Sequence, residues 1–140
     1  MIQGLSHITF VVRDLQRMTR LLVDGLGARE IYASGEETFS IAREKFFLLG
    51  GIWIAAMEGE RQAPRGYDHV AFAVADGDLD AYGERLRALG VDIRPPRPRV
   101  PGEGRSLYFY DDDDHLFELH SGTLDARLAA YARARERTAP

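Results

Sequence analysis

Residues 6–14 read SHITFVVRD and residues 68–76 read DHVAFAVAD, and this pair of segments decides the fold. The segments lie 62 residues apart, and His, Phe, Val and Asp recur at matching places in both. A repeat spaced by nearly half the chain indicates two similar supersecondary units. Side chains alternate between two faces along each segment, which is typical of a β-strand that opens each unit.

The sequence after each opening strand predicts the same order of elements. Asp14 is placed to cap a helix over 15–25, and Asp78 to cap a helix that runs through Leu89. Three strands are expected after each helix. They are placed at about 38–42, 46–50 and 52–58, and at about 91–94, 106–111 and 115–120. The sequence therefore predicts an α+β protein built from paired βαβββ modules.

The 140 residues are expected to form a single domain. Module one is expected at about 4–60 and module two at about 66–122, followed by an Ala-, Leu- and Arg-rich helix at about 123–136. Residues 94–105 read RPPRPRVPGEGR, and four prolines with two glycines predict a loop there.

Bulk properties exclude several classes of function. The net charge of −4 provides no basic field for nucleic acid, and no apolar run approaches the roughly 20 residues that span a bilayer. The N-terminal segment lacks the pattern of a signal peptide. The chain has no cysteine, and therefore no disulfide, thiolate ligand or cysteine nucleophile. We expect a cytoplasmic enzyme or binding domain with no nucleic-acid or membrane partner.

The repeat also predicts a metal site. His7 and His69 hold equivalent places on the two opening strands, so pseudo-twofold symmetry would let both imidazoles converge. Glu118 lies in the apolar run HLFELH, where a carboxylate is costly to bury unless it is paired or binds a metal. The residue 62 positions earlier is Ala56, which leaves coordination positions open for water and substrate. Nitrogen and oxygen ligands without sulfur suit Mn, Fe, Zn, Co or Ni.

A structural role is the alternative for each histidine taken alone, since a single His at the start of a strand is usually a satisfied polar residue. Two at repeat-equivalent positions, together with a carboxylate in an apolar strand, favour ligation. His115 follows the acidic run DDDD and is expected in or after a turn. His120 shares a strand face with Glu118 and is expected beside the ligands rather than among them.

A local excess of arginine predicts an anion site in this acidic protein. Only Glu103 opposes the arginines of the 94–105 loop, which are Arg94, Arg97, Arg99 and Arg105. Guanidinium groups in a loop rich in Pro and Gly suit a phosphate-like or carboxylate anion. Ser106 and Tyr108 follow on one strand face and would add hydroxyl groups. The alternative is a solvated basic loop, which a lone run of charge usually is.

Three segments carry a resemblance to a known family: GLSHITFVVRDL (4–15), SIAREKFFLLGGIWIAAMEGE (40–60) and RPRVPGEGRSLYFYDDDDHLFELHSGTL (97–124). The chain resembles the vicinal oxygen chelate superfamily, which includes glyoxalases and extradiol dioxygenases, and within it FosX-type fosfomycin hydrolases. The resemblance extends from residue 1 to about 131. It implies the vicinal oxygen chelate fold and Mn(II)-dependent hydration of the epoxide fosfomycin. It also implies a homodimer in which His7 serves a metal held by the His69 and Glu118 of a second copy.

The resemblance further implies roles for individual residues. His7, His69 and Glu118 become the metal ligands, and Glu44 in the REKF segment becomes the general base. The residues alone favour a charged hairpin turn at AREKFF. Phosphonate contacts are implied at Thr9, Arg97, Arg99, Ser106, Tyr108 and Arg127. The pair Asp113–Asp114 departs from the expected Asn or Gly at a turn position.

Three other functions remain open at this point. A thiol transferase on the same scaffold would open the epoxide with glutathione or another thiol, and Glu44 argues against it because a thiolate has little need of a water-activating base. A metal-free protein that sequesters the antibiotic would have no use for three convergent ligands. An iron dioxygenase shares the ligand pattern, but those enzymes usually repeat the module four times.

Overall fold

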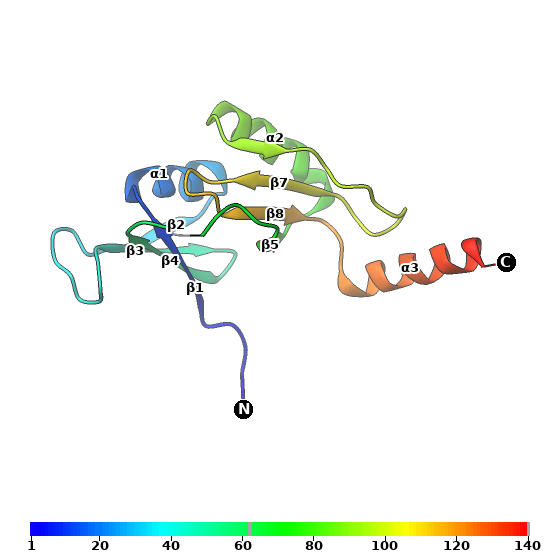
Figure 1. Cartoon of the computed structure of the whole chain (residues 1–140), viewed down its shortest axis with the longest axis horizontal. Coiled ribbons are helices and arrows are strands. Elements are labelled where there is room, and N and C mark those ends of the chain that lie inside the picture. Colours follow the sequence, from blue (N-terminus) through cyan, green and yellow to red (C-terminus); the bar gives the residue numbers. More distant parts are fainter. Residues whose placement is uncertain (62, 140) are drawn as a thin grey trace. The chain divides into compact units, whose positions relative to one another are not determined.

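The computed structural model describes residues 1–61 and 63–139, which divide into two compact units (Figure 1). The first unit is Met1–Gly66 with Asp111–His115, and the second is Tyr67–Tyr110 with Leu116–Pro140. The architecture is α+β, and the expected order of one strand, one helix and three strands occurs in both halves of the chain.

A four-stranded sheet forms the first unit, with strand order β1-β4-β3-β2. Strands β1 and β4 are parallel, and the other neighbours are antiparallel. The elements of this unit are β1 (His7–Val12), α1 (Leu15–Arg20), the π-helical turn η1 (Leu21–Gly25), β2 (Arg29–Ala33), β3 (Glu44–Leu49) and β4 (Ile52–Glu58).

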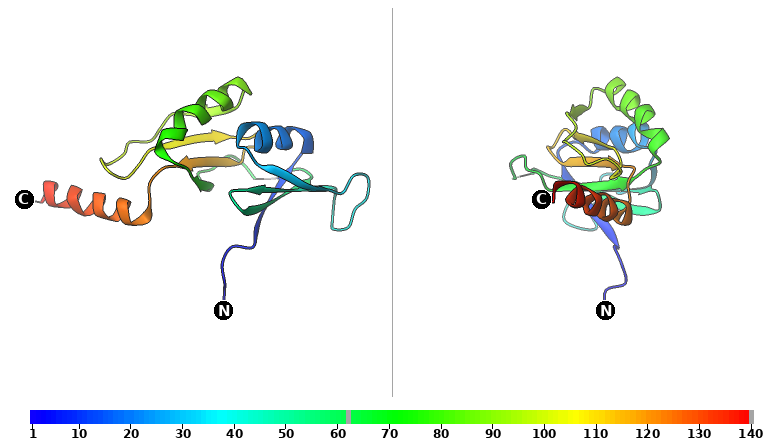
Figure 2. Two further views of the ribbon diagram at one scale, coloured as in Figure 1. Left: turned by 180° about the vertical axis from the view of Figure 1, so that it is seen from behind. Right: turned by 90° about the vertical axis from the view of Figure 1, so that its right-hand side faces the viewer.

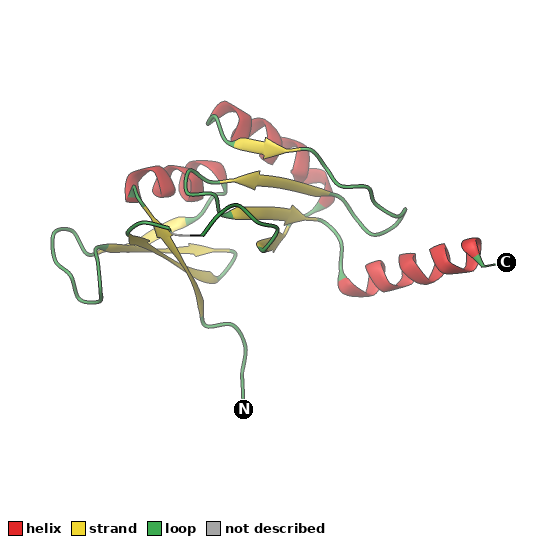
Figure 3. Ribbon diagram, in the orientation of Figure 1, coloured by secondary structure: helices red, strands yellow, loops and turns green. Residues whose placement is uncertain are grey.

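The second unit repeats this topology with strand order β5-β8-β7-β6, where β5 and β8 are parallel. Its elements are β5 (His69–Ala73), the 3-10 turn η2 (Asp76–Asp78), α2 (Leu79–Ala88), β6 (Asp92–Arg94), β7 (Ser106–Tyr110), β8 (Leu116–His120) and α3 (Leu124–Thr138). Residues 95–105 form the predicted loop between β6 and β7 (Figure 3). Helix α3 follows β8 and extends away from the second sheet (Figure 2).

Helix ends follow from local hydrogen bonding. Asp14 caps α1 as predicted, because its Oδ1 accepts the backbone N–H groups of Gln16 and Arg17 at 2.8 and 3.1 Å. The predicted cap at Asp78 is wrong. Asp78 has helical backbone angles and makes no capping hydrogen bond, since the 3-10 turn η2 already leads into α2.

One predicted strand is wrong. The segment 38–42 is a series of bends, and the strand between helix and hairpin is β2, at Arg29–Ala33. Phe39 and Ile41 produced the alternating pattern, but their side chains are 73% and 84% exposed and contact no core. The hairpin turn favoured at AREKFF is also wrong, since β3 begins at Glu44 and pairs with β4.

The register of the sheets corrects the expected equivalence of Glu118. His7 pairs with Trp53 and Thr9 with Ala55 in the first sheet, whereas Ala71 pairs with Glu118 in the second. Thr9 and Ala71 are repeat-equivalent, so Ala55, not Ala56, matches Glu118. A shift of one residue places a side chain on the opposite face of a sheet. Ala56 accordingly pairs with Phe10 on the face that packs against the helix.

Each sheet buries one face against its own helix. In the first unit this core includes the fully buried Val12, Leu22, Phe47 and Ile54. In the second, Phe109 and Phe117 stack with ring centroids 5.4 Å apart, and Leu86 of α2 is fully buried. Burial of one such side chain contributes roughly 1.5–3 kcal/mol. The opposite face carries His7, Thr9 and Glu44 among apolar residues in the first sheet and His69, Ser106, Tyr108, Glu118 and His120 in the second.

The turn between β7 and β8 belongs to the first unit. Arg13 Nε donates to the buried Asp113 at 2.9 Å, and Arg65 Nε pairs with Asp114 at 2.6 Å. Phe10 meets the ring of His115 edge-on at 5.1 Å. Asp114 has a φ of 64°, which explains why the position favours Asn or Gly. Within residues 1–61 and 63–139, no helix is long and apolar enough to cross a membrane.

Candidate metal centre and anion-binding network

The ring nitrogen Nε2 of His69 faces the carboxylate of Glu118. Its Nδ1 lies 2.7 Å from the carbonyl oxygen of Tyr67, which can only accept a hydrogen bond, so Nδ1 carries the hydrogen. In the neutral ring, Nε2 is then an acceptor, and it lies 2.9 Å from Glu118 Oε2. Two acceptors this close need a cation or a proton between them. A divalent metal, to which a neutral imidazole and a carboxylate are common ligands, fits the pair.

Glu118 sits in the middle of β8 with only 3% of its surface exposed. Its Oε1 accepts a hydrogen bond from Ser106 Oγ and a second from Arg99 Nη2 at 3.2 Å. Burial alone would raise the pKa of Glu118. The hydrogen bonds from Ser106 and Tyr108 outweigh that effect, so the pKa of Glu118 is lowered and the carboxylate stays ionised.

His7 lies in the first unit, at the start of β1. Its Nδ1 is 3.1 Å from Ser6 Oγ, and its ring lies against Trp53 with centroids 4.3 Å apart. The part of the chain that the structure describes contains no group of three His, Asp or Glu residues close enough to hold a metal. The structure therefore brings two of the three predicted ligands together, and ligation by His7 stays a prediction.

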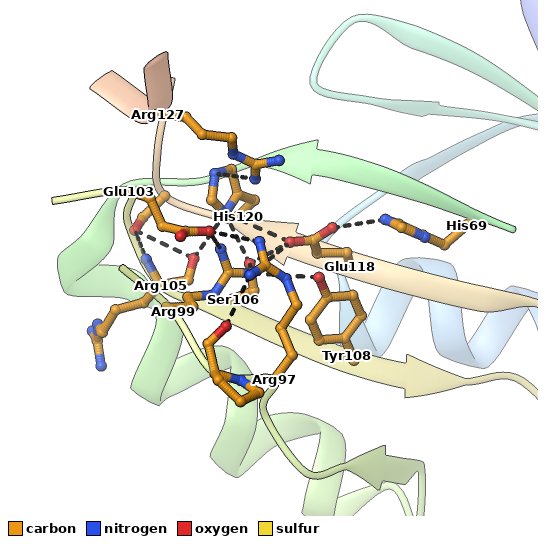
Figure 4. A network of polar contacts seen from close by, with 12 residues as sticks. His69, Arg97, Arg99, Glu103, Arg105, Ser106, Tyr108, Glu118, His120 and Arg127 are labelled. Atoms are coloured by element: carbon orange, nitrogen blue, oxygen red, sulfur yellow. Dashed lines mark hydrogen bonds and ion pairs between the residues drawn. The ribbon is translucent and has the colours of Figure 1, made fainter. Parts of the chain in front are cut away.

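The predicted anion-binding residues of the second unit gather around Glu118 (Figure 4). Arg99 Nη2 donates to Ser106 Oγ and, at 3.3 Å, to the hydroxyl of Tyr108. Burial and the hydrogen bond to Tyr67 raise the pKa of Tyr108 to about 12, so its hydroxyl remains a donor at neutral pH. Arg97 also donates to Glu103, at 2.6 Å. These contacts favour an ordered hydrogen-bonded network over a solvated basic loop.

The two remaining loop arginines make different contacts. Arg94 pairs with Asp92 at 3.3 Å, and Arg105 pairs with Asp76 and Asp80 at 3.0 and 3.2 Å. All five side chains are more than 40% exposed. Neither arginine has a contact with Glu118.

His120 connects Arg127 to this network. Arg127 Nη2 lies 3.2 Å from His120 Nε2, which must accept because a guanidinium only donates. The hydrogen is therefore on Nδ1, 3.1 Å from the carbonyl oxygen of Arg105 and 2.8 Å from Ser106 Oγ. Burial lowers the pKa of His120, and the positive charge of Arg127 acts in the same direction. This arrangement agrees with the expected place of His120 beside the ligands.

Glu44 and Thr9 lie in the first unit, on the sheet face that carries His7. Glu44 is the first residue of β3, and Ser34 fixes its backbone: Ser34 Oγ accepts the Glu44 N–H at 3.0 Å, and the Ser34 N–H donates to the Glu44 carbonyl at 3.0 Å. The side chain is half-buried. A cavity of about 410 Å³ that Glu44 helps to line also includes Gln16, Lys45 and Glu58, which belong to the helix side of the sheet. A half-buried carboxylate on the His7 face can accept a proton from water.

Sequence reasoning did not select Glu103. Its side chain is 1% exposed, and it holds both Arg97 and Arg99. A lone carboxylate between two glycines in an arginine-rich loop was the available signal. A buried acid must be paired, and the arginines were its only candidates within the loop.

Comparisons with known proteins agree with this geometry. Residues 4–119 match the model of the Glyoxalase/Bleomycin resistance protein/Dioxygenase superfamily. The chain is 62% identical over 136 residues to the fosfomycin resistance protein FosX of Mesorhizobium japonicum, covering 97% of this chain and 98% of the relative.

A solved structure and a second kind of relative complete the comparison. A mutant FosX from Listeria monocytogenes, complexed with Mn(II) and 1S,2S-dihydroxypropylphosphonic acid, matches with a TM-score of 0.85 and 53% identity over 94% of this chain and 99% of that one. The metallothiol transferase FosB of Shouchella clausii is 36% identical and covers 100% of this chain and 92% of its own length.

Proposed function

This chain belongs to the FosX fosfomycin resistance proteins of the glyoxalase/bleomycin resistance protein/dioxygenase superfamily, and we propose that it is an Mn(II)-dependent hydrolase that adds water to fosfomycin. The observation that carries the proposal is the Nε2 of His69 facing the carboxylate of Glu118, beside an arginine and two hydroxyl groups. The Listeria relative binds Mn(II) and a dihydroxypropylphosphonic acid, which is the diol that hydration of fosfomycin yields.

The metal ligands are His69 and Glu118 of the second unit, with His7 as the third. A divalent cation held there supplies Lewis-acid stabilisation of the negative charge that develops on the epoxide oxygen as the ring opens. Mn(II) accepts mixed nitrogen and oxygen ligands, and other divalent metals share this preference.

Glu44 is the proposed general base. It removes a proton from the water that attacks the epoxide carbon bearing the phosphonate, and such assistance typically contributes about 10²–10⁴-fold in rate. Its place on the His7 face of the first sheet supports the role. No covalent enzyme intermediate is needed.

The phosphonate is the proposed ligand of the arginine and hydroxyl groups. Arg99, Ser106 and Tyr108 already form one hydrogen-bonded cluster, and a dianion can accept from all three. Thr9, Arg97 and Arg127 complete the proposed set. Fixing the anion in this way would hold the epoxide in line for attack.

We also propose that the two units make one vicinal oxygen chelate domain and that the protein acts as a cytoplasmic homodimer. Helix α3 supports a partner chain, because Leu124, Leu128 and Tyr131 follow one helix face and are 72%, 56% and 38% exposed. In such a dimer His7 would serve the metal held by the second unit of the other copy.

A thiol transferase is the second candidate, favoured by the 36% identity to a metallothiol transferase. Phosphorus NMR of fosfomycin with Mn(II)-loaded protein and no thiol separates the two. Formation of the diol, absent in a His69→Ala control, is expected. Conversion that waits for added glutathione or another thiol would replace the hydrolase with a transferase. Binding without conversion under either condition would indicate a sequestering protein.

A further inference from the structure

Arg99 joins two carboxylates. Its Nη1 donates to Glu103 Oε1 at 3.0 Å, and its Nη2 donates to Glu118 Oε1 at 3.2 Å (Figure 4). The side chain is 13% exposed, so water screens these interactions only weakly. The guanidinium therefore acts as a counter-ion of the Glu118 carboxylate through Oε1, whereas Oε2 of the same carboxylate faces His69 and the proposed metal position.

Glu103 holds Arg99 in this place. Both of its oxygen atoms are occupied: Oε1 accepts from Arg97 and Arg99, and Oε2 accepts the backbone N–H of Val100 at 2.9 Å. The loop cannot easily rearrange around it. Gly104, which follows Glu103, has a φ of 90°, and a Cβ there would lie 2.6 Å from the backbone nitrogen of Gly122.

We propose that Arg99 is the resident counter-cation of Glu118 and that Glu103 offsets its charge, so that this pair sets the affinity of the site for a divalent metal. The inference rests on the proposed metal role of Glu118. A metal ion that binds Glu118 meets the positive charge of Arg99 close to its ligand, and like charges at this distance repel. Glu103 reduces that repulsion because its negative charge lies on the far side of the guanidinium.

The effects of the two residues on metal affinity are therefore opposite in sign. Arg99→Gln removes the competing charge but keeps hydrogen-bonding groups, and Glu103→Gln removes the offsetting charge but keeps the shape. A merely structural role would instead weaken metal binding in both variants. Asp76→Asn is the matched control, because Asp76 also pairs with an arginine of the loop, Arg105, which does not reach Glu118.

The test measures the Mn(II) dissociation constant by electron paramagnetic resonance of free Mn(II), at fixed pH and ionic strength, without fosfomycin or sulfate. At the Coulomb energies of a partly buried pair we expect about tenfold tighter binding for Arg99→Gln and about threefold to tenfold weaker binding for Glu103→Gln. Asp76→Asn should stay within about twofold of wild type, because exposed pairs contribute little. Arg99→Lys keeps the charge and should stay within about threefold.

Unchanged or weaker binding in Arg99→Gln overturns the inference, and so does an equal gain in Arg99→Lys, which would assign the effect to side-chain size. Circular dichroism checks that Glu103→Gln is folded. If it is not, the two Arg99 variants decide the matter alone. Wild-type protein that binds no Mn(II) would overturn the proposed function, an outcome distinct from wild-type binding that Arg99→Gln leaves unchanged.

Discussion

The two sheets have the same topology but carry different chemistry at matching positions. In each sheet the first position of the opening strand is a histidine. Elsewhere the free faces differ: where the first sheet has Glu44, Phe46, Ala55 and Met57, the second has Ser106, Tyr108, Glu118 and His120. One fold, used twice, thus divides the proposed work between a water-activating face and a face for the metal and the anion.

Electrostatics make the division sharper. The carboxylate of the second face is buried and hydrogen bonded to Ser106 and Arg99, whereas Ala55 at the matching position offers no ligand. The carboxylate of the first face, Glu44, is half-buried at the start of β3 instead. The repeated module supplies the scaffold, and differences at single matching positions decide which face is proposed to activate water and which to bind the metal and the anion.

The largest expected effect separates Glu44 from Ser106, its match in the second sheet. Glu44→Gln should lower the rate of fosfomycin hydration by about 10²–10⁴-fold, because it removes the proton acceptor, and leave Mn(II) affinity within about twofold. Phosphorus NMR gives the rate. Ser106→Ala is the control. Because it removes a proposed anion contact, KM should rise by a larger factor than kcat falls. Hydration that survives in Glu44→Gln would remove the base from the first face.

The register predicts the next effect, on folding stability. Ala56→Glu places a carboxylate in the helix-facing core of the first sheet and should lower the free energy of unfolding by about 4 kcal/mol or more. Ala55→Glu places the carboxylate on the His7 face and should lower the free energy of unfolding by roughly half as much. Added Mn(II) should restore part of this lost stability. Urea titrations with and without Mn(II) measure both. Equal costs would contradict the assignment of Ala55 as the counterpart of Glu118.

The pH dependence of folding stability should depend on Glu103, the buried loop carboxylate of the second unit. Burial alone would raise the pKa of Glu103, but hydrogen bonds from Val100 and Arg97 lower it. A lowered pKa adds stability that is present above the unfolded pKa of about 4.3 and is lost as the pH falls through the folded value. Glu103→Gln should cost about 3 kcal/mol at pH 7 and flatten the loss of stability below pH 5. Urea titrations between pH 7 and 3 test this, and an unchanged acid profile would contradict it.

The smallest effect is expected at the turn that the second module contributes to the first unit. Arg65 and Asp114 are 43% and 48% exposed, so Arg65→Ala should cost about 0–1 kcal/mol, less at high salt. Arg13→Ala should cost more, because Asp113 is 6% exposed in its side chain and loses a donor. Thermal unfolding at two salt concentrations compares them, and equal losses would mean that burial of Asp113 is unimportant.

The repeat predicted most of the fold, because it encodes both the opening strands and the order of elements. It failed where the copies differ. Strand β2 lies at 29–33, where Arg29 and Glu30 hide the alternation, and the offset between β4 and β8 is one residue greater than that between the opening strands. Such a one-residue shift arises from a difference in loop length between the two modules, which the alternation of side chains along a strand does not reveal.

Site residues could be predicted from the sequence where the signal lies in the neighbouring residues, and not where it depends on tertiary contacts. A carboxylate in an apolar strand identified Glu118, and its contact with His69 is present. Glu44 was selected only through the resemblance, because a polar residue beside a turn looks the same whether or not it is a base. Glu103 was not predicted because its role depends on which arginines contact it, and tertiary structure decides those contacts.

The turn at 111–115 has a consequence for synthesis of the protein. Arg13 and Asp113 are 100 residues apart in sequence, so the first unit cannot be completed until most of the second unit has been synthesised. At about 5–20 residues per second, the nascent first sheet waits for several seconds without that turn. During this interval Phe10 and Arg13 lack His115 and Asp113, and the half-built chain is most open to chaperones and to mispairing with its neighbours.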